Sequence, residues 1–461
     1  MAFLCCFPPE KDLDMPKVNI FWFRRDLRLE DNAGLYHALK GEYPVLPLFI
    51  FDRNILDGLE DKKDARVEFI HNTLQELNGE LKELGGSMLV RYGFPNEIWG
   101  SLLSEFDIHA VYTNRDYEPY ALERDGEVKS LLDAKGVEFH TFKDHVIFEK
   151  GEVNKADGTP YTVFTHYSRK WREKLASEMD TFVDAEGNEE PVSFFLKPYP
   201  TEDYFSHFYQ MKPQPIPSLE GMGFEPTDIV IPSKVVSRGV IRNYDKTRDF
   251  PALDGTSRLG IHFRFGTISI REKAWKAGRL NDTFLNELIW RDFYAMILAE
   301  FPQVAKRSFR PQYDQIEWRN KEEEFQKWCE GQTGYPIVDA GMRQLNQTGY
   351  MHNRVRMITA SFLTKHLLID WRWGEAYFAQ KLLDFDLASN NGGWQWAAGC
   401  GTDAAPYFRI FNPTSQQEKF DKDFRYVHRW VPEYNTPRYP KPIVDHKMAR
   451  ERCLSVYKAA L

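Results

Sequence analysis

The strongest constraint on the fold is a change of hydrophobic pattern partway along the chain. Its first part alternates short apolar runs, at residues 18–23, 45–51, 87–90, 110–112 and 137–142, with stretches of helical spacing such as 31–40 and 64–84. This alternation is typical of an α/β domain with a doubly wound, mainly parallel sheet. No GxGxxG follows the first run, so the sequence lacks a dinucleotide fingerprint.

The second part of the chain has a different hydrophobic pattern. Prolines gather from Pro191 to Pro232 with little periodicity, which predicts a connector. Beyond about residue 236 the strand pattern disappears, and helices are expected at 319–330, at 336–348 and from 351 to about 371. We therefore expect a tail over 1–17, an α/β domain over 18–148, a connector over 149–235 and an all-α domain over 236–461.

Composition narrows the class of protein. A chain of 461 residues usually exceeds one hydrophobic core, which favours two domains. No apolar run is long enough to span a membrane, and five cysteines without metal or disulfide spacing indicate no metal site and a reducing cytoplasm. We expect a monomer. The net charge of −8 does not exclude a nucleic-acid partner, because phosphate binding needs only a local basic patch.

Three segments of the second part concentrate polar and aromatic residues. Glu287, Trp290, Arg291 and Tyr294 share one helix face at i, i+3, i+4 and i+7. Residues 351–357 place an asparagine and two arginines before an apolar helix, and 384–396 combine two aspartates, two asparagines and two tryptophans. Buried acids need partners, and an Arg–Asp pair would provide one for a site or for structure alone.

These segments carry a resemblance to a known family. Together with residues 21–28, 333–340 and 401–413, they resemble the cryptochrome/photolyase family, and within it the bacterial class I cyclobutane pyrimidine dimer photolyases. The resemblance implies a light-dependent DNA repair enzyme that binds FAD in the helical domain. FADH⁻, excited by blue light, passes an electron to a flipped-out pyrimidine dimer in UV-damaged DNA, the ring splits and the electron returns.

The resemblance also assigns residues to FAD. Asp384 and Arg356 match an ion pair beside the isoalloxazine, Asp386 matches the carboxylate at N3/O4, and Asn390 matches the residue that faces N5. The other matching positions are Tyr244, Thr256, Ser257, Arg258, Leu259, Gly260, Phe284, Arg291 and Asn353. Many relatives have Ser at the position of Gly260, which removes one hydroxyl contact to phosphate but keeps the backbone N–H.

Lesion and DNA contacts follow by the same resemblance. Trp290 and Trp396 match two indoles that wedge against the extruded dimer, and Glu287 matches a carboxyl that hydrogen-bonds a base. Met357 distinguishes dimer photolyases from (6-4) photolyases, which have His there. The matching DNA contacts are Arg248, Arg291, Asn353, Arg354 and Arg409, in addition to Glu287, Trp290 and Trp396.

Two further features are implied in the same way. Trp394, Trp371 and Trp318 match an electron-hopping chain from the flavin to the surface. Glu118 and Lys306 resemble antenna positions of folate-binding relatives, so methenyltetrahydrofolate is preferred over 8-hydroxy-5-deazaflavin or FMN.

Two alternatives to repair are open. A cryptochrome photoreceptor would share the flavin pocket, but the complete set of Glu287, Trp290, Met357 and Trp396 favours repair. A flavin oxidoreductase for small metabolites is disfavoured because no nicotinamide site is visible.

Overall fold

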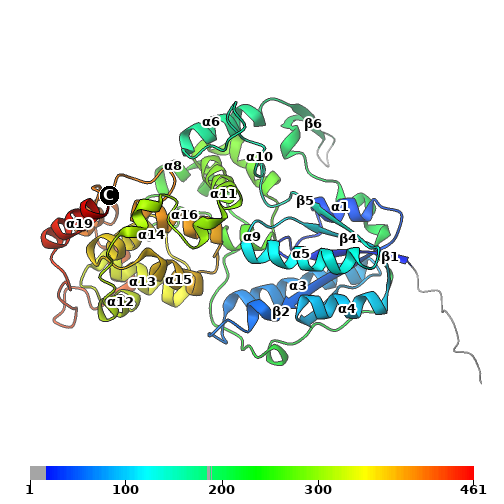
Figure 1. The fold of residues 1–461 in the computed structure, drawn as a ribbon, viewed down its shortest axis with the longest axis horizontal. Coiled ribbons are helices and arrows are strands. Elements are labelled where there is room, and N and C mark those ends of the chain that lie inside the picture. The colour runs from blue at the N-terminus through cyan, green and yellow to red at the C-terminus, as the bar shows by residue number, and fades with distance from the viewer. Residues whose placement is uncertain (1–16, 184–186, 188) are drawn as a thin grey trace, which may run out of the picture.

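The computed structural model describes residues 17–183, 187 and 189–461, so the expected tail lies outside the described residues except for Lys17. Figure 1 shows strands β1, β4 and β5 with helices α3, α4 and α5 in one half of the molecule, and helices α12 to α16 with α19 in the other. None of the helices within the described ranges has the length and apolarity needed to cross a membrane. The same ranges contain no cluster of three His, Cys, Asp or Glu side chains arranged to hold a metal ion.

The first half is built on a five-stranded sheet with the order β3-β2-β1-β4-β5, in which every neighbouring pair is parallel. The strands are β1 (Lys17–Phe23), β2 (Val45–Asp52), β3 (Leu89–Gly93), β4 (Asp107–Asn114) and β5 (Glu138–Phe142), joined by α1 (Ala33–Leu39), α2 (Arg53–Leu56), α3 (Ala65–Glu83), α4 (Pro95–Glu105) and α5 (Pro119–Asp133). The predicted parallel α/β sheet is confirmed.

Both faces of the central strand are buried, which explains its continuous apolar sequence. Phe21 and Phe23 of β1 pack in the cluster formed with α1 and α3, whereas Ile20 and Trp22 pack with α4 and α5 on the other face. Strand β3 begins later than predicted. The Ser87 hydroxyl and the Met88 N–H both bind Asn78 Oδ1 of α3, at 3.0 and 2.9 Å, so the chain joins the sheet after them.

The stretch expected as a connector is more ordered than its prolines indicate. It holds α6 (Phe164–Leu175), a hairpin of β6 (Met179–Val183) and β7 (Glu189–Ser193), and the 3₁₀ turns η1 (Phe194–Leu196), η2 (Thr201–His207) and η3 (Glu220–Met222). Trp171 of α6 is fully buried, and its indole N–H donates to Asp292 Oδ2 at 3.0 Å. The same oxygen accepts the backbone N–H groups of Ile147 and Phe148, each at 3.1 Å. One buried carboxylate thus fastens this stretch to helix α11 (Asp282–Glu300).

The rest of the chain is helical, and no strand follows residue 236 within the described ranges. Its other α-helices are α7 (Arg238–Arg242), α8 (Tyr244–Thr247), α9 (Gly260–Phe265), α10 (Ile270–Leu280), α12 (Glu322–Cys329), α13 (Pro336–Thr348), α14 (Asn353–Ser361), α15 (Trp371–Lys381), α16 (Leu387–Ala398), α17 (Pro413–Phe420), α18 (Arg425–Trp430) and α19 (His446–Ala460). Short 3₁₀ turns lie at η4 (Pro302–Ala305) and η5 (Pro311–Gln315), and a π-helical turn at η6 (Phe362–His366). The predicted all-α second part is confirmed.

Two of the predicted helices are wrong at their ends. The helix expected at 319–330 begins at Glu322, because Asn320 has a φ of 46° and the backbone N–H of Arg319 donates to Leu368 O at 2.7 Å. The helix expected to continue to about 371 ends at Ser361. It passes into the π-helical turn and breaks at Leu368, whose φ is 50°.

Helix α13 matches its prediction. It begins at Pro336 and ends before Gly349, whose φ of 64° places it in the left-handed region that favours glycine.

The last helix is joined to the end of α16 by a buried clamp. Ala398 O accepts the Lys365 ammonium at 2.8 Å and the Tyr457 hydroxyl of α19 at 3.0 Å. The Lys365 nitrogen also lies 3.8 Å from the centre of the Tyr457 ring. Burial lowers the pKa of Lys365 to about 8.

Replacing Asp292 with Ala is expected to destabilise the fold by about 3–5 kcal/mol, because three buried donors lose their shared acceptor. Thermal unfolding followed by circular dichroism would measure the loss. Asp282→Ala is the matched control on the same helix, since the Asp282 side chain is 77% exposed and, among the described residues, pairs with Arg172 alone. Equal melting temperatures for the two variants would contradict the fastening role.

Candidate functional site

A cavity of about 460 Å³ opens within the helical half. Side chains from α11, α14, α15 and α16 line it, together with the segments before α9 and before α16. The lining residues are Arg248, Glu287, Trp290, Arg291, Tyr294, Asn353, Arg354, Arg356, Met357, Ala360, Phe378, Leu382, Asp384, Phe385, Asp386, Ser389, Asn390, Gly393, Trp394 and Trp396. The three segments that concentrate polar and aromatic residues in the sequence therefore meet at one place.

Helix α11 presents the predicted face to this cavity. Glu287, Trp290, Arg291 and Tyr294 all line it, as their spacing predicts. The Trp290 indole stacks on the ring of Phe164 from α6, with centroids 3.6 Å apart and planes within 6° of parallel. Sequence reasoning did not find Phe164, because it lies more than a hundred residues away in the expected connector.

An ion pair lies at one end of the cavity. Arg356 Nη2 donates to both carboxylate oxygens of Asp384, at 3.1 and 3.0 Å, and Arg356 Nε donates to Met351 O at 2.7 Å. Gly260 approaches this pair closely, since a Cβ added there would lie 2.4 Å from Asp384 Oδ2. The absence of a side chain at position 260 leaves room for the carboxylate.

Asp386 connects the cavity with the α/β half. Its Oδ2 accepts Arg25 Nη2 at 2.6 Å and lies 3.5 Å from Arg264 Nη1, while Oδ1 caps α16 by accepting the Ser389 N–H at 3.0 Å. Glu118 binds the same two arginines, with 3.2 Å to Arg25. We call Arg25, Glu118, Arg264 and Asp386 the cross-domain cluster.

Arginines control the ionisation of Asp386. Burial alone would raise the pKa of its carboxyl, but Arg25, then Arg264 and Arg291, outweigh burial and hold the pKa well below its usual range. Asp386 therefore stays ionised and acts as an acceptor. The sequence did not reveal Arg25 or Arg264 as partners, although Arg25 belongs to a conspicuous run of basic residues after β1.

Asn390 has a fixed amide orientation. Its Nδ2 donates to the backbone oxygen of Glu375 at 3.1 Å and to Glu375 Oε1 at 3.0 Å. With the NH₂ group engaged by α15, the Asn390 side-chain oxygen has no hydrogen-bond donor among residues 17–183 and 189–461 and can accept one from a ligand in the cavity. Glu375 is a second partner that sequence reasoning missed.

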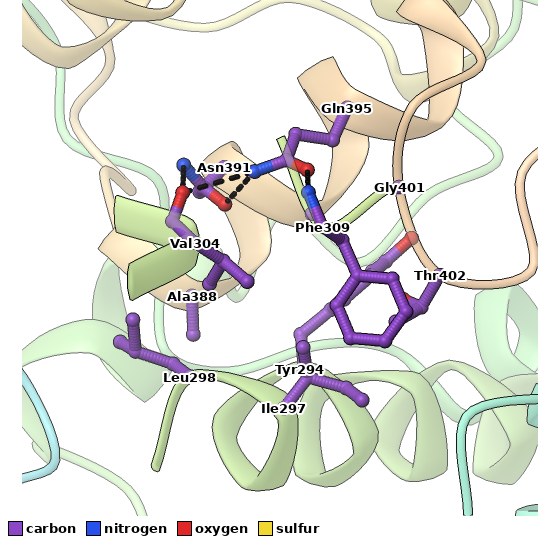
Figure 2. Close-up of a pocket in the computed structure, with 11 residues that line it drawn as sticks. Tyr294, Ile297, Leu298, Val304, Phe309, Ala388, Asn391, Gln395, Gly401 and Thr402 are labelled. Atoms are coloured by element: carbon purple, nitrogen blue, oxygen red, sulfur yellow. Dashed lines mark hydrogen bonds between the residues drawn. The ribbon is translucent and has the colours of Figure 1, made fainter. Parts of the chain in front are cut away.

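Two buried amides of helix α16, Asn391 and Gln395, bind backbone groups of the segment before α12, as Figure 2 shows. Asn391 Nδ2 and Gln395 Nε2 donate to Val304 O at 3.0 and 2.9 Å, and Gln395 Oε1 accepts the Phe309 N–H at 2.8 Å. A Cβ at Gly392 would lie 2.2 Å from the Tyr294 ring, so this glycine allows α16 to approach α11. Asn390 and Trp394 are thereby held towards the cavity.

The remaining positions expected to contact FAD surround the cavity without lining it. Tyr244 packs edge-on against Phe284 with centroids 5.2 Å apart. Thr256 Oγ1 lies 3.1 Å from the Tyr350 hydroxyl, and the Arg258 guanidinium lies 5.3 Å from the Tyr350 ring centre. Tyr350 therefore joins this segment to α14 and was missed by sequence reasoning. Ser257 Oγ accepts the Leu259 N–H at 3.4 Å.

The basic residues expected at DNA differ in position. Arg248 and Arg354 line the cavity and are paired with acids, Arg248 with Glu287 at 2.5 Å and Arg354 with Asp249 at 2.6 Å. Arg291 is turned inward and donates to the backbone oxygens of His145 and Phe263. Arg409 is exposed outside the cavity lining.

The three tryptophans of the expected chain lie at different depths. Trp394 lines the cavity, packs against Phe378 with centroids 5.0 Å apart, and contacts Trp328, a tryptophan outside the expected set, at 6.0 Å. Trp371 is buried beneath the Arg372 guanidinium. Trp318 is half-buried with its ring 6.0 Å from that of Tyr457.

The two residues expected to bind the antenna pigment contact different parts of the structure. Glu118 belongs to the cross-domain cluster, with its side chain 19% exposed. Lys306 is exposed, and its backbone oxygen accepts Arg372 Nε at 3.0 Å. In the part of the chain that the structure describes, these two side chains form no ion pair with each other.

Comparison with known families agrees with both halves of the fold. Residues 19–185 match the family described as DNA photolyase, and residues 284–438 match the family described as the FAD binding domain of DNA photolyase. The second match includes the helices that enclose the cavity. Fold and cavity together therefore define a flavin-binding protein of the photolyase class.

Individual relatives extend over nearly the whole chain. A deoxyribodipyrimidine photo-lyase of Halobacterium salinarum is 38% identical, with 96% of this chain and 99% of the relative covered. The crystal structure of a bacterial class III photolyase from Agrobacterium tumefaciens has a TM-score of 0.81 and 33% identity, covering 98% of this chain and 99% of that one. An archaeal photolyase from Sulfolobus tokodaii with two FAD molecules has a TM-score of 0.78 and 33% identity, covering 96% and 99%. The chain belongs to the DNA photolyase family.

A pH dependence follows from the residue that caps α14. His352 Nδ1 accepts the Arg354 N–H at 3.2 Å, and burial, with a smaller contribution from Arg356, lowers the pKa of His352 to about 4. The pKa of His352 is lower in the folded than in the unfolded protein. Its contribution to the free energy of unfolding is therefore complete above about pH 6.5 and is lost as the pH falls towards 4. We expect the free energy of unfolding at pH 5 to be about 2 kcal/mol lower than at neutral pH because of His352.

His352→Asn is the informative variant, since asparagine caps helices without titrating. Between pH 7 and pH 5, the melting temperature of the wild type should fall more than that of this variant. Parallel pH profiles for the two proteins would show that His352 does not titrate in this range.

Proposed function

We propose that this protein is a light-dependent DNA repair enzyme, a deoxyribodipyrimidine photolyase that splits cyclobutane pyrimidine dimers. The observation that carries the proposal is the convergence of Glu287, Trp290, Met357, Asn390 and Trp396 on one cavity. The name of the Halobacterium salinarum relative supports the same activity. Repair is favoured over a receptor role because the residues assigned to the lesion accompany those assigned to the cofactor.

The cavity has the donor set that FAD needs. Asp384 and Arg356 are paired at one end, Gly260 leaves space beside them, and Asp386 and Asn390 offer acceptors whose orientation neighbouring residues fix. We propose that these residues hold the isoalloxazine, while Tyr244, residues 256–260, Phe284, Arg291 and Asn353 complete the site. When bound and reduced, FADH⁻ supplies a light-excited electron donor.

Glu287 is suited to donate a hydrogen bond to a base. Burial raises the pKa of its carboxyl, although Arg248 acts in the opposite direction. A carboxyl that keeps its proton to higher pH donates to a pyrimidine carbonyl that accumulates charge. Trp290 and Trp396 offer apolar surfaces to an extruded pyrimidine dimer, and Met357 completes the apolar side.

The DNA backbone is assigned to basic residues at the mouth. Arg248 and Arg354 line the cavity and are proposed to bind the phosphates that flank an extruded dimer, and the exposed Arg409 is proposed to extend this contact. These contacts position the strand without reading its sequence. Arg291 is turned inward and Asn353 is exposed; both line the cavity, and we propose that they steady its lesion side.

Several finer assignments are part of the proposal. Methenyltetrahydrofolate is our preferred antenna, although Glu118 is occupied by arginines, and the second FAD of the Sulfolobus tokodaii photolyase supports a flavin as the alternative. We also propose that the protein is a monomer and that its domains have the limits expected from the sequence. A reducing cytoplasm agrees with Cys329, Cys400 and Cys453, which are free and buried.

The direct test mixes the protein, loaded with FAD and chemically reduced, with an oligonucleotide that carries one thymine dimer. We expect the dimer to disappear under blue light and to persist in darkness, as measured by chromatography of the strand. Loss in darkness, or no loss under light with fully reduced flavin, would end the repair proposal.

A second test concerns the relay that we propose from the cavity to the surface through Trp394, Trp371 and Trp318. Trp394→Phe should slow photoreduction of the oxidised holoprotein at least about tenfold, because phenylalanine cannot be oxidised at accessible potentials. Absorbance under illumination measures this step. Repair by chemically reduced variant should remain close to wild type, and parallel loss of both activities would contradict the relay role.

A further inference from the structure

Arg354, which lines the cavity, is held by a carboxylate that the proposed function does not use. Arg354 Nη2 lies 2.6 Å from Asp249 Oδ1, and its guanidinium carbon lies 4.4 Å from the Phe420 ring centre. Arg354 Nη1 lies 3.8 Å from Met357 Sδ. The side chain is only 19% exposed, so its position is defined by these contacts.

A second arginine shares the arrangement. Arg248 Nη1 binds Glu287 Oε1 at 2.5 Å, and Arg248 Nε lies 3.9 Å from Asp249 Oδ1. Two guanidinium groups therefore face two carboxyl groups in one cluster. We call Arg248, Asp249, Glu287 and Arg354 the mouth cluster.

The two acids of the mouth cluster differ in accessibility. Glu287 lines the cavity, whereas Asp249 lies outside the lining with its side chain 39% exposed. Asp249 is thus accessible to solvent, and its Oδ1 occupies an N–H group of Arg354 that an incoming anion could otherwise bind. A carboxylate and a phosphodiester both carry one negative charge and both bind a guanidinium fork.

We propose that Asp249 is an intramolecular stand-in for a DNA phosphate, which holds Arg354 in place in the free protein and is displaced when the lesion-bearing strand binds. This inference rests on the proposed function and adds a residue that controls affinity. Asp249 keeps the arginine preorganised and neutralised against other polyanions. Binding then exchanges one anion for another at Arg354, so Asp249 lowers the net gain from that contact.

The experiment measures binding in darkness with the FAD-loaded protein. A fluorescent duplex with one thymine dimer, and the same duplex without it, are titrated across a series of KCl concentrations. Asp249→Asn should tighten binding of the dimer duplex roughly fivefold, the value of a strong surface ion pair. Its plot of log affinity against log salt should be steeper by up to about one, because no anion is displaced from Arg354.

Two comparisons separate this effect from a general change of charge. Asp245→Asn removes the same charge from the same segment, but Asp245 contacts Asn281 and neither arginine, so it should tighten binding less than about twofold. In an Arg354→Gln background, adding Asp249→Asn should recover less than half of the gain. Asp249→Ser serves as a second variant, and bound-flavin absorbance confirms that each variant is folded.

Equal affinities for Asp249→Asn and Asp245→Asn, or a full gain without Arg354, would overturn the proposal. Either result can occur in a protein that repairs dimers normally. Failure of repair itself would instead appear in the wild type, as no light-dependent loss of the dimer, so the two failures are distinguishable.

Discussion

The site depends on charges shared between the two halves of the molecule. Asp386 is buried, and a buried carboxylate without counter-ions would be strongly destabilising or would take up a proton. Arg25 comes from the segment after β1, and Glu118 precedes α5 after β4, so both belong to the carboxyl edge of the parallel sheet. This edge, between β1 and β4, is where ligands of such sheets usually bind. Here the charged side chains at this edge belong instead to the cross-domain cluster, which borders a cavity in the helical half.

The cross-domain cluster also links local and global structure. Asp386 caps α16, and α16 carries Asn390, Trp394 and Trp396. The same carboxylate therefore starts the helix, sets its axis relative to the sheet and borders the cavity. The amides of Asn391 and Gln395 fix rotation about that axis from the other side. Together these contacts define which side chains of α16 face the cavity.

Regular periodicity made much of the fold predictable from the sequence. The parallel sheet, α3, α13 and the polar face of α11 follow from apolar spacing and from Pro336 and Gly349 at helix ends. The start of α12 and the break at Leu368 do not, because contacts between distant backbone segments impose left-handed φ angles there. Sequence spacing carries no information on such contacts.

The site was predictable to a similar degree. Residues that line the cavity stood out by type, since acids, amides and indoles are rare on apolar helices. The residues that hold these side chains in position did not stand out in the sequence. For Arg25, Asp249, Tyr350 and Glu375, distance in sequence hides what each side chain contacts in the fold.

The clamp around Ala398 gives the final helix an influence far from its own position. Tyr457 lies in the last turn of α19, yet its hydroxyl shares with Lys365 the terminal carbonyl of the helix that carries Trp394 and Trp396. Deleting that turn would leave a buried ammonium group beside an empty ring site and loosen the end of α16. An affinity tag added after Leu461 would leave this contact in place. Removal of the last few residues, Tyr457 among them, would shift the indoles of Trp394 and Trp396 in the cavity.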